Sequence, residues 1–558
     1  MKWKQRGNTT TVLDTVMRLS GMTEQELVSP SPCPPQNIQN LTSAAVRIKT
    51  AIASKEPISI MGDYDCDGVT SGCILYFLLR ELGTTPAIRF PRRMSEGYGL
   101  SIKAVDEFQA PGLLITVDNG IAANDAIQHA KERGLDVIIL DHHLPGDVLP
   151  PADIIVDPHI EPDKNGYVEY CGAGLSFKLS QLLLKNNTDL LKTITALAAI
   201  GTIADGVSLT GDNRYIVKHG LPLLKARDVC CGLNALTSTA EIYAFNEDDI
   251  GFKVGPMINA AGRMYDNGAN IAFNAITADS KFDAEQACEL LLKCNNERKE
   301  KTAEAVERTE QEIADSCLFG MVPMVVYVPE ILEGIVGIVT GRIAEKYKTP
   351  TFILTDSETP GVIKGSGRSY GSINLMDFVD AARPVLLTGG GHAAAAGISC
   401  NISDYAEMVN LMQAAAPDTD LADTDTLEYD MKVPADSVAK TYLEVAKYAP
   451  FGTGCPKPVF LVENIVLSPR AGATCKYMGK NAEHVKLHAK GFSAIAFGRS
   501  EEYRNMGCPS CLDIVGNISQ NVFRYASEYQ VEITDFQAHK QTAVTSSLLS
   551  ALRANGTI

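Results

Sequence analysis

The sequence predicts an α/β protein: a doubly wound parallel sheet in its first half, then a long connector helix, a smaller α/β region and a C-terminal all-β barrel. Three observations predict this order. Over roughly the first 160 residues, short apolar segments alternate with helix-length segments, which is typical of βαβ units. The stretch 281–318 is helical in pattern and highly charged. The last hundred residues contain short strand-like segments with turns between them.

The parallel sheet is predicted from five short apolar segments. They lie at 58–60, 87–90, 113–117, 137–140 and 154–156. Helix-length stretches, such as 70–82 and 122–133, separate several of them, so that successive strands can pair in parallel through helical crossovers. We expect this sheet and its helices to form a first domain at 1–280.

The connector helix and the second domain follow. The stretch 281–318 carries polar residues nearly all round the predicted helix, as in helices that bridge domains through solvent. We therefore expect a connector there and a second, smaller α/β domain at 319–420. That domain is predicted from a strand at 324–328, a helix at 334–347, a strand at 351–354 and the glycine-rich turns after them.

The final region, 421–558, is expected to contain a linker and an OB-like nucleic-acid-binding domain, and an acidic stretch spans its start. Acids this crowded are usually a solvated linker; they are Asp418, Asp420, Asp423, Asp425, Glu428 and Asp430. The barrel is predicted from strand-like segments at 459–466, 484–487, 494–497, 512–516 and 531–534. Its basic residues outnumber Glu463 and Glu483 and suggest a single-strand-binding surface, with an ordinary exposed face as the alternative. They are Lys457, Arg470, Lys476, Lys480, Lys486, Lys490 and Arg499.

Composition excludes several classes of protein. The 558 residues are long enough for about two to four domains. A net charge of −17 argues against a protein that coats nucleic acid, although it allows one local basic groove. Only one C-x-x-C pair, Cys508 and Cys511, occurs among 14 cysteines, which favours free thiols over disulfides or structural zinc. No apolar run approaches about 18 residues, so we expect a cytoplasmic protein without signal peptide or membrane contact.

Acids and imidazoles follow four of the predicted strands. In open parallel sheets, ligands bind beyond the carboxyl ends of the strands. One such aspartate would usually be a helix N-cap, but repetition over four strands favours a site. The residues are Asp63, Asp65 and Asp67 after the first strand, Asp118 after the third, Asp141, His142 and His143 after the fourth, and Asp157 after the fifth.

The residue types predict a metal site. Three carboxylates at alternating positions 63, 65 and 67 repel one another unless a cation neutralises them. An EF-hand-like calcium loop is the alternative, but its twelfth position is Ile74 rather than glutamate. Mixed Asp and His ligands suit Mn²⁺ or Mg²⁺, and Asp205 could complete the shell. There are enough ligands for two ions about 4 Å apart, the arrangement used in phosphoryl transfer.

Nine motifs point to one family. They are DYDCDG at 63–68, RMSEGYG at 93–99, DNG at 118–120, DHH at 141–143, GAGLSFK at 172–178, GPMINAAGR at 255–263, KGSGRS at 364–369, GGGHAAAAG at 389–397 and PFGTG at 450–454. The DHH motif and the acids before it resemble the DHH phosphoesterase superfamily, and GGGHAAAAG resembles its DHH-associated domain. Together, the nine resemble the RecJ family of single-stranded-DNA-specific exonucleases over nearly the whole chain.

The resemblance implies a role for each site residue. It implies metal ligation by Asp63, Asp65, Asp67, Asp118, His142 and Asp205. Several superfamily members have a metal-binding histidine where this chain has Met61, which leaves the first shell to Asp63 or water. The implied catalytic set is Asp65, Asp67, Asp118, His142 and His143, with His143 on the scissile phosphate or assisting the leaving group.

The phosphate-binding residues can also be interpreted physically. The glycines at 389–391 let the backbone approach an anion, and His392 can donate to a phosphate oxygen. Ser366, Arg368 and Arg93 can hold a terminal phosphate by charge-assisted hydrogen bonds, which in this family sets polarity at the 5′ end. Arg263 either contacts the nucleic-acid backbone or forms a buried interdomain salt bridge.

Three functions are considered. The first is a 5′→3′ exonuclease that degrades single-stranded DNA to mononucleotides in repair and recombination, with the strand gripped by an OB-like barrel. It would act as a monomer, with a helicase and a single-strand-binding protein as candidate partners. The second is another DHH phosphoesterase acting on oligoribonucleotides, cyclic dinucleotides or pyrophosphate. The third is a catalytically inactive DNA-binding scaffold, whose signature would be loss of the acids.

Overall fold

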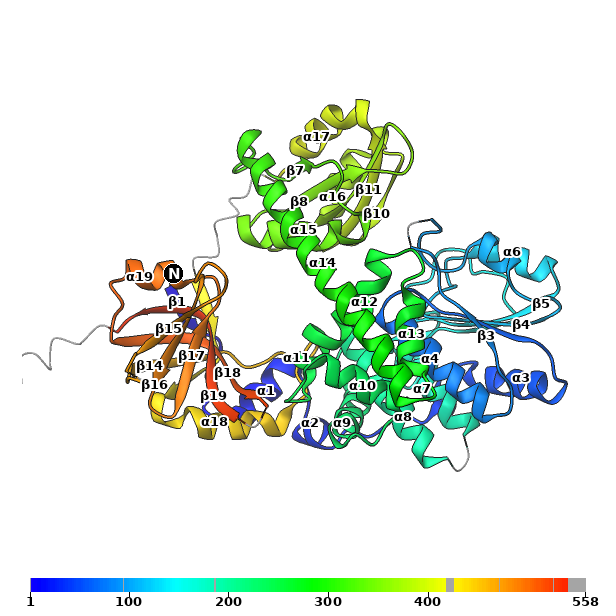
Figure 1. Cartoon of the computed structure of the whole chain (residues 1–558), viewed down its shortest axis with the longest axis horizontal. Coiled ribbons are helices and arrows are strands. Elements are labelled where there is room, and N and C mark those ends of the chain that lie inside the picture. Colours follow the sequence, from blue (N-terminus) through cyan, green and yellow to red (C-terminus); the bar gives the residue numbers. More distant parts are fainter. Residues whose placement is uncertain are drawn as a thin grey trace, which may run out of the picture. The chain divides into compact units, whose positions relative to one another are not determined.

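The computed structural model describes residues 2–93, 95–184, 187–417, 426–470, 472–524 and 526–539. The chain divides into two compact units (Figure 1). The large unit comprises Pro32–Val207 and Gly211–Thr424, and the small unit comprises Met1–Ser31, Ser208–Thr210 and Asp425–Ile558. Each unit has its own hydrophobic core.

A five-stranded parallel sheet forms the centre of the large unit's first half, as the sequence predicts. Its strands are β2 (Ile58–Met61), β3 (Ala87–Arg89), β4 (Gly112–Val117), β5 (Leu135–Leu140) and β6 (Ile154–Val156), in the spatial order β3-β2-β4-β5-β6. All neighbouring strands are parallel. The chain passes from β2 to β3 on one side and then returns to β4 on the other. This switch point lies between β2 and β4, where open sheets bind their ligands.

Helices cover both faces of this sheet. On one face, Ile60 and Ile115 pack with Leu75 and Leu175; on the other, Leu114 packs with Ile127. The helices are α3 (Leu41–Ala53), α4 (Cys66–Glu81), α5 (Ile102–Asp106), α6 (Asn124–Glu132), α7 (Gly172–Leu183) and α8 (Thr188–Asp205). Five further helices follow: α9 (Gly211–Ala226), α10 (Cys231–Thr239), α11 (Glu247–Asp249), α12 (Gly255–Met264) and α13 (Ala269–Thr277). The doubly wound fold class is therefore confirmed.

The predicted connector is the 35-residue helix α14 (Lys281–Asp315), which runs between the two sheets of the large unit (Figure 1). The expectation of a helix polar nearly all round is wrong. One stripe of α14 is buried, and it packs against α10, α12, α13 and α15 (Glu333–Tyr347). The stripe includes Cys288, Arg298, Thr302 and Thr309, so polar residue types conceal it in the sequence.

A second sheet completes the large unit. Its strands are β7 (Met324–Tyr327), β8 (Thr351–Asp356), β9 (Val362–Arg368), β10 (Thr388–Gly391) and β11 (Ala395–Asn401), in the order β10-β11-β9-β8-β7. Only β7 and β8 pair in parallel; the other described pairs of this sheet are antiparallel. Its helices are α15 (Glu333–Tyr347), α16 (Leu375–Ala381) and α17 (Tyr405–Ala414).

The small unit contains the predicted all-β barrel. Its strands are β12 (Thr426–Tyr429), β13 (Met431–Pro434), β14 (Phe460–Val466), β15 (Cys475–Met478), β16 (His484–Ala489), β17 (Phe492–Ala496), β18 (Cys511–Phe523) and β19 (Ala526–Ala538). The main sheet has the order β13-β14-β18-β19-β17-β16-β15. A bridge between Leu467 and Ala489 joins the end of β14 to β16, so five strands close into a ring. Helices α18 (Val438–Val445) and α19 (Ser500–Asn505) accompany them.

The N-terminal residues belong to the small unit, although the expected first domain begins at residue 1. Strand β1 (Lys2–Gln5) pairs in parallel with β12. Helices α1 (Val12–Ser20) and α2 (Glu24–Val28) bury Val12, Val16 and Leu27 in the barrel's core. Their apolar faces are covered by residues more than 400 positions away, a contact that no local pattern predicts.

Asp430 ties these N-terminal residues to the barrel. Its carboxylate accepts from Arg6 Nε at 3.0 Å, from Arg18 Nη2 at 2.5 Å and from the Val459 amide at 2.9 Å. The expectation of a solvated segment is therefore wrong for Asp430, which is fully buried. Of the other acids in that stretch, Asp418, Asp420, Asp423 and Asp425 lie outside the described residues.

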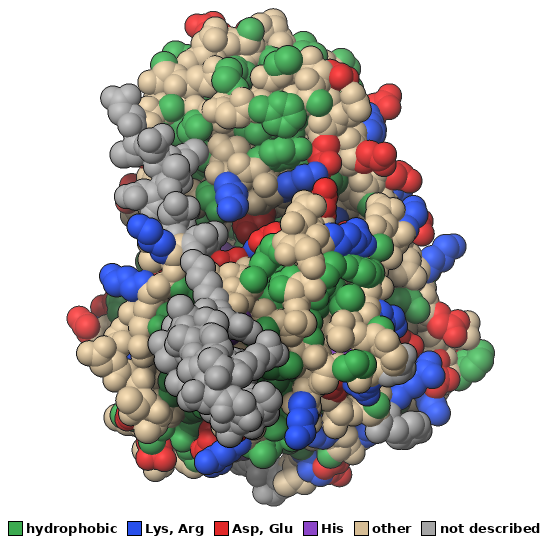
Figure 2. Space-filling model, turned by 90° about the vertical axis from the view of Figure 1, so that its left-hand side faces the viewer, with side chains coloured by type: hydrophobic (Ala, Val, Ile, Leu, Met, Phe, Trp, Pro, Cys, Tyr) green, Lys and Arg blue, Asp and Glu red, His purple; other side chains and the backbone are tan. Residues whose placement is uncertain are grey.

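Basic and acidic side chains are interspersed on the face shown in Figure 2. On the barrel, acidic neighbours neutralise some of the cations that the sequence predicts to form a basic surface. Arg470 and Lys486 both pair with Glu528 at 2.6 Å, and Arg499 pairs with Glu502 and Asp535. Lys476, Lys480 and Lys490 are exposed cations on the same barrel. In the described part of the chain, no helix has the length and apolarity needed to cross a membrane.

Candidate active site at the end of the parallel sheet

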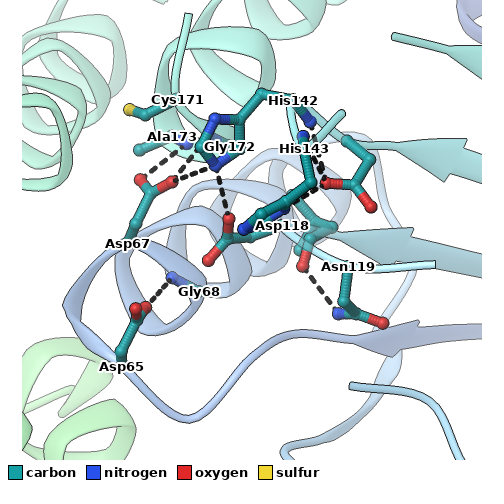
Figure 3. A network of polar contacts seen from close by, with 12 residues as sticks. Asp65, Asp67, Gly68, Asp118, Asn119, His142, His143, Cys171, Gly172 and Ala173 are labelled. Carbon is teal, nitrogen blue, oxygen red and sulfur yellow. Dashed lines mark hydrogen bonds and ion pairs between the residues drawn. The ribbon is translucent and has the colours of Figure 1, made fainter. Parts of the chain in front are cut away.

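The turn after β2 places three carboxylates at the start of α4. Asp65 is the N-cap of α4 and accepts from the Gly68 amide at 3.0 Å. Asp67, in the first turn, accepts from the amides of Gly172 at 2.6 Å and Ala173 at 3.0 Å (Figure 3). These two amides open α7, so the positive end of a second helix fixes the Asp67 carboxylate.

The ends of β4 and β5 bring in Asp118 and two histidines. His142 Nε2 lies 3.0 Å from Asp118 Oδ1 and 3.8 Å from Asp67 Oδ2. Asp118 has a φ of 61°, a left-handed conformation that is uncommon outside glycine. Figure 3 shows Asp67, Asp118 and His142 converging from three separate elements.

Asp141 orients the histidine loop. Its carboxylate accepts from His143 Nδ1 at 2.8 Å, and from the amides of Ile121, His142 and His143 at 2.8–3.2 Å. Burial alone would raise the pKa of Asp141, but these bonds, above all that from His143, lower it. The same hydrogen bond stabilises the protonated form of His143. Burial lowers the pKa of His143, but the bond to Asp141 outweighs it and raises this pKa to about 9.

The six predicted metal ligands fall into two groups with no member in common. In each group, one ligand atom per residue lies within 4.8 Å of the others. The first group is Asp63, Asp65 and Asp118, and the second is Asp67, His142 and Asp205. A third group, made of Asp118, His142 and His143, overlaps both. Within the described residues, these are the clusters that could hold a metal ion.

The electrostatics of the cluster favour a cation. Burial, followed by the neighbouring carboxylates, raises the pKa of Asp63, Asp65 and Asp118. The same two causes raise the pKa of Asp205 to about 7. Asp63 Oδ1 is buried with no hydrogen-bond partner in the described structure. Crowded carboxylates, of which Asp63, Asp67 and Asp118 are buried, and an imidazole are a donor set that fits Mn²⁺ or Mg²⁺.

A cationic pocket of about 610 Å³ is lined by residues from both halves of the large unit. Four of the five predicted substrate-binding residues line it: Arg93, Arg263, Ser366 and Arg368. Arg368 Nη1 donates to Ser366 Oγ at 2.8 Å and to the Gly367 carbonyl at 2.7 Å.

Arg263 is not part of a salt bridge. Its Nη1 donates to the Gly334 carbonyl at 3.2 Å, and no ion pair is found for it in the described structure. Burial, and then the charge of Arg93, lowers the pKa of Arg263 to about 10. Arg93 in turn lies over the ring of Tyr64, 4.7 Å from its centroid. Arg93 and Arg263 thus both line the pocket, and among the described residues no carboxylate forms an ion pair with Arg263.

His392 is the predicted residue that the structure does not bring to the pocket. It is exposed at the turn between β10 and β11, and it does not line the cavity. Its backbone amide donates to the Ala395 carbonyl at 2.8 Å, which closes the turn.

Sequence reasoning gave no role to Tyr98 or to the amides that hold Asp67. The Tyr98 hydroxyl lies 3.1 Å from the Asp118 carbonyl oxygen and 3.2 Å from His143 Nε2. Both Tyr98 and Gly172 stand inside quoted motifs, so the motifs contained the signal. Their partners, however, are 20 and 105 positions away in the sequence, and only the fold brings them into contact.

Comparisons with known proteins identify the same three regions. Family models match residues 57–202 (DHH family, N-terminal domain), 322–417 (DHHA1 domain) and 429–535 (RecJ OB domain). The single-stranded-DNA-specific exonuclease RecJ of Bacillus subtilis is 34% identical over 517 residues, which are 90% of this chain and 64% of that protein. This chain therefore spans less than two thirds of that relative's length.

Two further matches cover more of the relative. RecJ of Haemophilus influenzae is 32% identical over 488 residues, which are 81% of this chain and 82% of that protein. The crystal structure of RecJ in complex with Mn²⁺ from Thermus thermophilus matches with a TM-score of 0.78 and 25% identity, over 97% of this chain and 80% of that one. With its DHH, DHHA1 and OB domains in this order, the chain belongs to the RecJ family.

Proposed function

We propose that this chain is a metal-dependent 5′→3′ exonuclease that hydrolyses single-stranded DNA to mononucleotides, in DNA repair and recombination. The observation that carries the proposal is that five carboxylates and one imidazole fall into two three-residue groups, which are linked by a third group made of Asp118, His142 and His143. The names of the relatives, single-stranded-DNA-specific exonucleases, support the choice of substrate.

Two divalent cations, Mn²⁺ or Mg²⁺, would be held by the two groups, Asp63, Asp65 and Asp118, and Asp67, His142 and Asp205. When bound, they supply activation of water and neutralisation of charge on the phosphate. Asp118 and His142, in contact at 3.0 Å, keep the two groups at a fixed separation. The amides of α7 keep Asp67 from turning away.

His143 and Tyr98 act on the phosphate side. The hydrogen bond to Asp141 favours the protonated form of His143, which can donate to a phosphate oxygen or to the departing 3′ oxygen. The carboxylate of Asp141 holds the Nδ1 side of the ring at 2.8 Å. Tyr98 contacts His143 and the backbone of Asp118, and so positions both.

The cationic pocket would bind the 5′-terminal phosphate and set the direction of digestion. Ser366 and Arg368 offer adjacent donors, and Arg93 and Arg263 add two more guanidinium groups. The exposed cations Lys476, Lys480 and Lys490 of the barrel would contact the rest of the strand. We place the protein in the cytoplasm as a monomer, with a helicase or single-strand-binding protein as partners that expose the strand.

A substrate panel with Mn²⁺ tests this proposal. It contains a 5′-phosphorylated single strand, the same strand as a duplex, an oligoribonucleotide, a cyclic dinucleotide and pyrophosphate. We expect the single strand to be digested at least ten times faster than the duplex, with nucleoside monophosphates as products. Hydrolysis of pyrophosphate or cyclic dinucleotide instead would favour another DHH phosphoesterase. Strand binding without any hydrolysis would favour an inactive scaffold, although all the acids are present.

A further inference from the structure

The pocket that takes the terminal phosphate continues past it along the face of the second sheet. On β9, Lys364, Ser366 and Arg368 alternate and point to the same side. Ser366 stands beside Gly397, and Gly397 beside Gly390, in one row across three strands. One pleat further, about 6.7 Å along the strands, Lys364, Ser399 and Thr388 form a second row. All six residues line the same cavity.

Neither the space around Gly390 and Gly397 nor their backbone conformation requires glycine at these two positions. A Cβ at Gly390 would meet nothing within 4 Å, and one at Gly397 would meet only the Gly365 carbonyl at 4.0 Å. Neither has a left-handed φ. Gly337 provides the contrast, because a Cβ there would lie 2.9 Å from Arg368 Nη2. A ligand group lying flat on the Gly390–Gly397 row explains their lack of side chains.

The second row offers hydrogen-bond donors. Thr388 Oγ1 and Ser399 Oγ are 2.6 Å apart, so one of the two hydroxyl protons forms this bond and the other is available to a ligand. Lys364 Nζ forms an ion pair with Glu333, which engages one of its three protons. Each of these groups can donate to a phosphate oxygen.

The charge of the pocket exceeds that of one terminal phosphate. Among its lining residues, Arg93, Arg263, Lys364 and Arg368 are cationic and Glu333 is anionic, a formal sum of four minus one, or +3. A terminal monophosphate brings a charge of about −2. About one positive charge is left, on the side of the second row. The volume of about 610 Å³ is in the range of whole-ligand pockets rather than of a single phosphate.

We propose that Lys364, Thr388 and Ser399 form a second phosphate subsite, through which the enzyme accepts DNA 5′ ends extended by a phosphoanhydride, such as a 5′-triphosphate. This inference rests on the proposed exonuclease function. The first cut breaks the same bond as on a monophosphate end. Water adds to the first internucleotide phosphorus, and the 3′ oxygen of the terminal nucleotide leaves and takes up a proton. The first product is then a nucleoside triphosphate, and the shortened strand carries a 5′-monophosphate.

The test compares one single strand with a 5′-hydroxyl, a 5′-monophosphate or a 5′-triphosphate, digested with Mn²⁺. In the wild-type protein we expect a KM for the triphosphate end no higher than for the monophosphate end, and a nucleoside triphosphate as the first product. In Lys364→Gln, the KM for the triphosphate end divided by the KM for the monophosphate end should rise about tenfold. This is the effect expected from losing one charge-assisted hydrogen bond. Thr388→Val should shift the ratio in the same direction.

Lys346→Gln is the matched control, because Lys346 is an exposed cation of α15 outside the pocket. It should leave both KM values unchanged. Resistance of the triphosphate end, where the monophosphate end is digested, would overturn the subsite and leave the exonuclease function intact. An unchanged KM ratio in Lys364→Gln would overturn the role of Lys364 in the same way. If no end is digested, the exonuclease function itself fails, and the subsite with it.

Discussion

His142 Nε2 lies 3.0 Å from Asp118 Oδ1, and this contact joins the two groups of ligands at the end of the parallel sheet. The two residues come from the ends of neighbouring strands, β4 and β5. Burial, followed by the charges of four neighbouring carboxylates, raises the pKa of Asp118. A bound cation would relieve that repulsion, so the proposed function requires metal both for the chemistry and for the electrostatic balance of the site.

Asp118→Asn should abolish hydrolysis and preserve strand binding. The amide keeps the shape of the side chain but removes a charge that belongs to two of the three ligand groups. We expect kcat to fall more than about a hundredfold, beyond the loss usual for residues that only support a ligand. Single-strand binding, measured by fluorescence anisotropy, should change less than about threefold. Asp125→Asn, at an exposed acid of α6, is the control; equal activity in the two variants would contradict the assignment of Asp118.

Without divalent cations, the stability of the large unit should fall as the pH rises from 6 to 8. The pKa of Asp205 is about 7 in the folded protein and 3.8 as its ordinary value, so from about pH 4 up to about pH 7 the folded state holds a proton that the unfolded state has lost. Because the unfolded state binds fewer protons there, the free energy of unfolding decreases with pH. His143, with its pKa raised to about 9, acts in the same direction above its ordinary pKa of 6.5.

Mn²⁺ should flatten this dependence, because it takes the place of the proton. The measurement is the melting temperature in EDTA and in Mn²⁺ at each pH, for the wild-type protein and for Asp205→Asn. We expect a shallower slope in the variant than in the wild type when EDTA is present. A melting temperature that rises with pH in EDTA would show that the carboxylates are not strained by their neighbours.

Arg368→Ala should weaken the preference for a 5′-phosphorylated end by about tenfold. The change removes a planar donor group that Ser366 holds against the pocket at 2.8 Å. The ratio of kcat/KM for 5′-phosphorylated and 5′-hydroxyl strands gives the answer directly. Lys346→Gln serves as control again, and an unchanged ratio in Arg368→Ala would move end recognition to other residues.

Asp430→Asn should destabilise the small unit by about 3 kcal/mol, the low end for breaking a buried ion pair, since both arginine partners are partly exposed. The chain has a single tryptophan, Trp3, whose Nε1 donates to Asp535 in the same unit at 2.7 Å. Tryptophan fluorescence during urea unfolding therefore reports on this unit. Asp436→Asn, at an exposed acid, should have no effect.

The stability that Asp430 contributes should also depend on pH. Burial opposes its charge, but hydrogen bonds from Arg6, the Val459 amide and Arg18 lower the pKa of Asp430 below its ordinary value of 3.8. Its contribution is therefore complete above about pH 4 and is lost as the pH falls through the folded-state pKa. The wild-type and Asp430→Asn proteins should converge in stability toward pH 3; a constant difference would place the effect elsewhere.

The sequence predicts those parts of the site that strand ends determine. Asp63, Asp118 and His142 follow apolar strands, so parallel pairing alone brings them together. It does not predict that the amide of Gly172 holds Asp67, because that depends on how α7 packs against α4. The same limit applies to Asp430, whose burial depends on arginines more than 400 residues away. His392 shows the converse, since its motif suggests a phosphate donor and the turn places it outside the pocket.

The central claim is tested most directly by digesting a single strand labelled at its 5′ or its 3′ end, with Mn²⁺ present. We expect immediate release of the 5′ label as a mononucleotide, while the 3′-labelled strand shortens progressively. Early release of the 3′ label, or internal fragments from both substrates, would contradict it. Repeating the digestion in EDTA should stop it completely, and Asp118→Asn should show neither pattern.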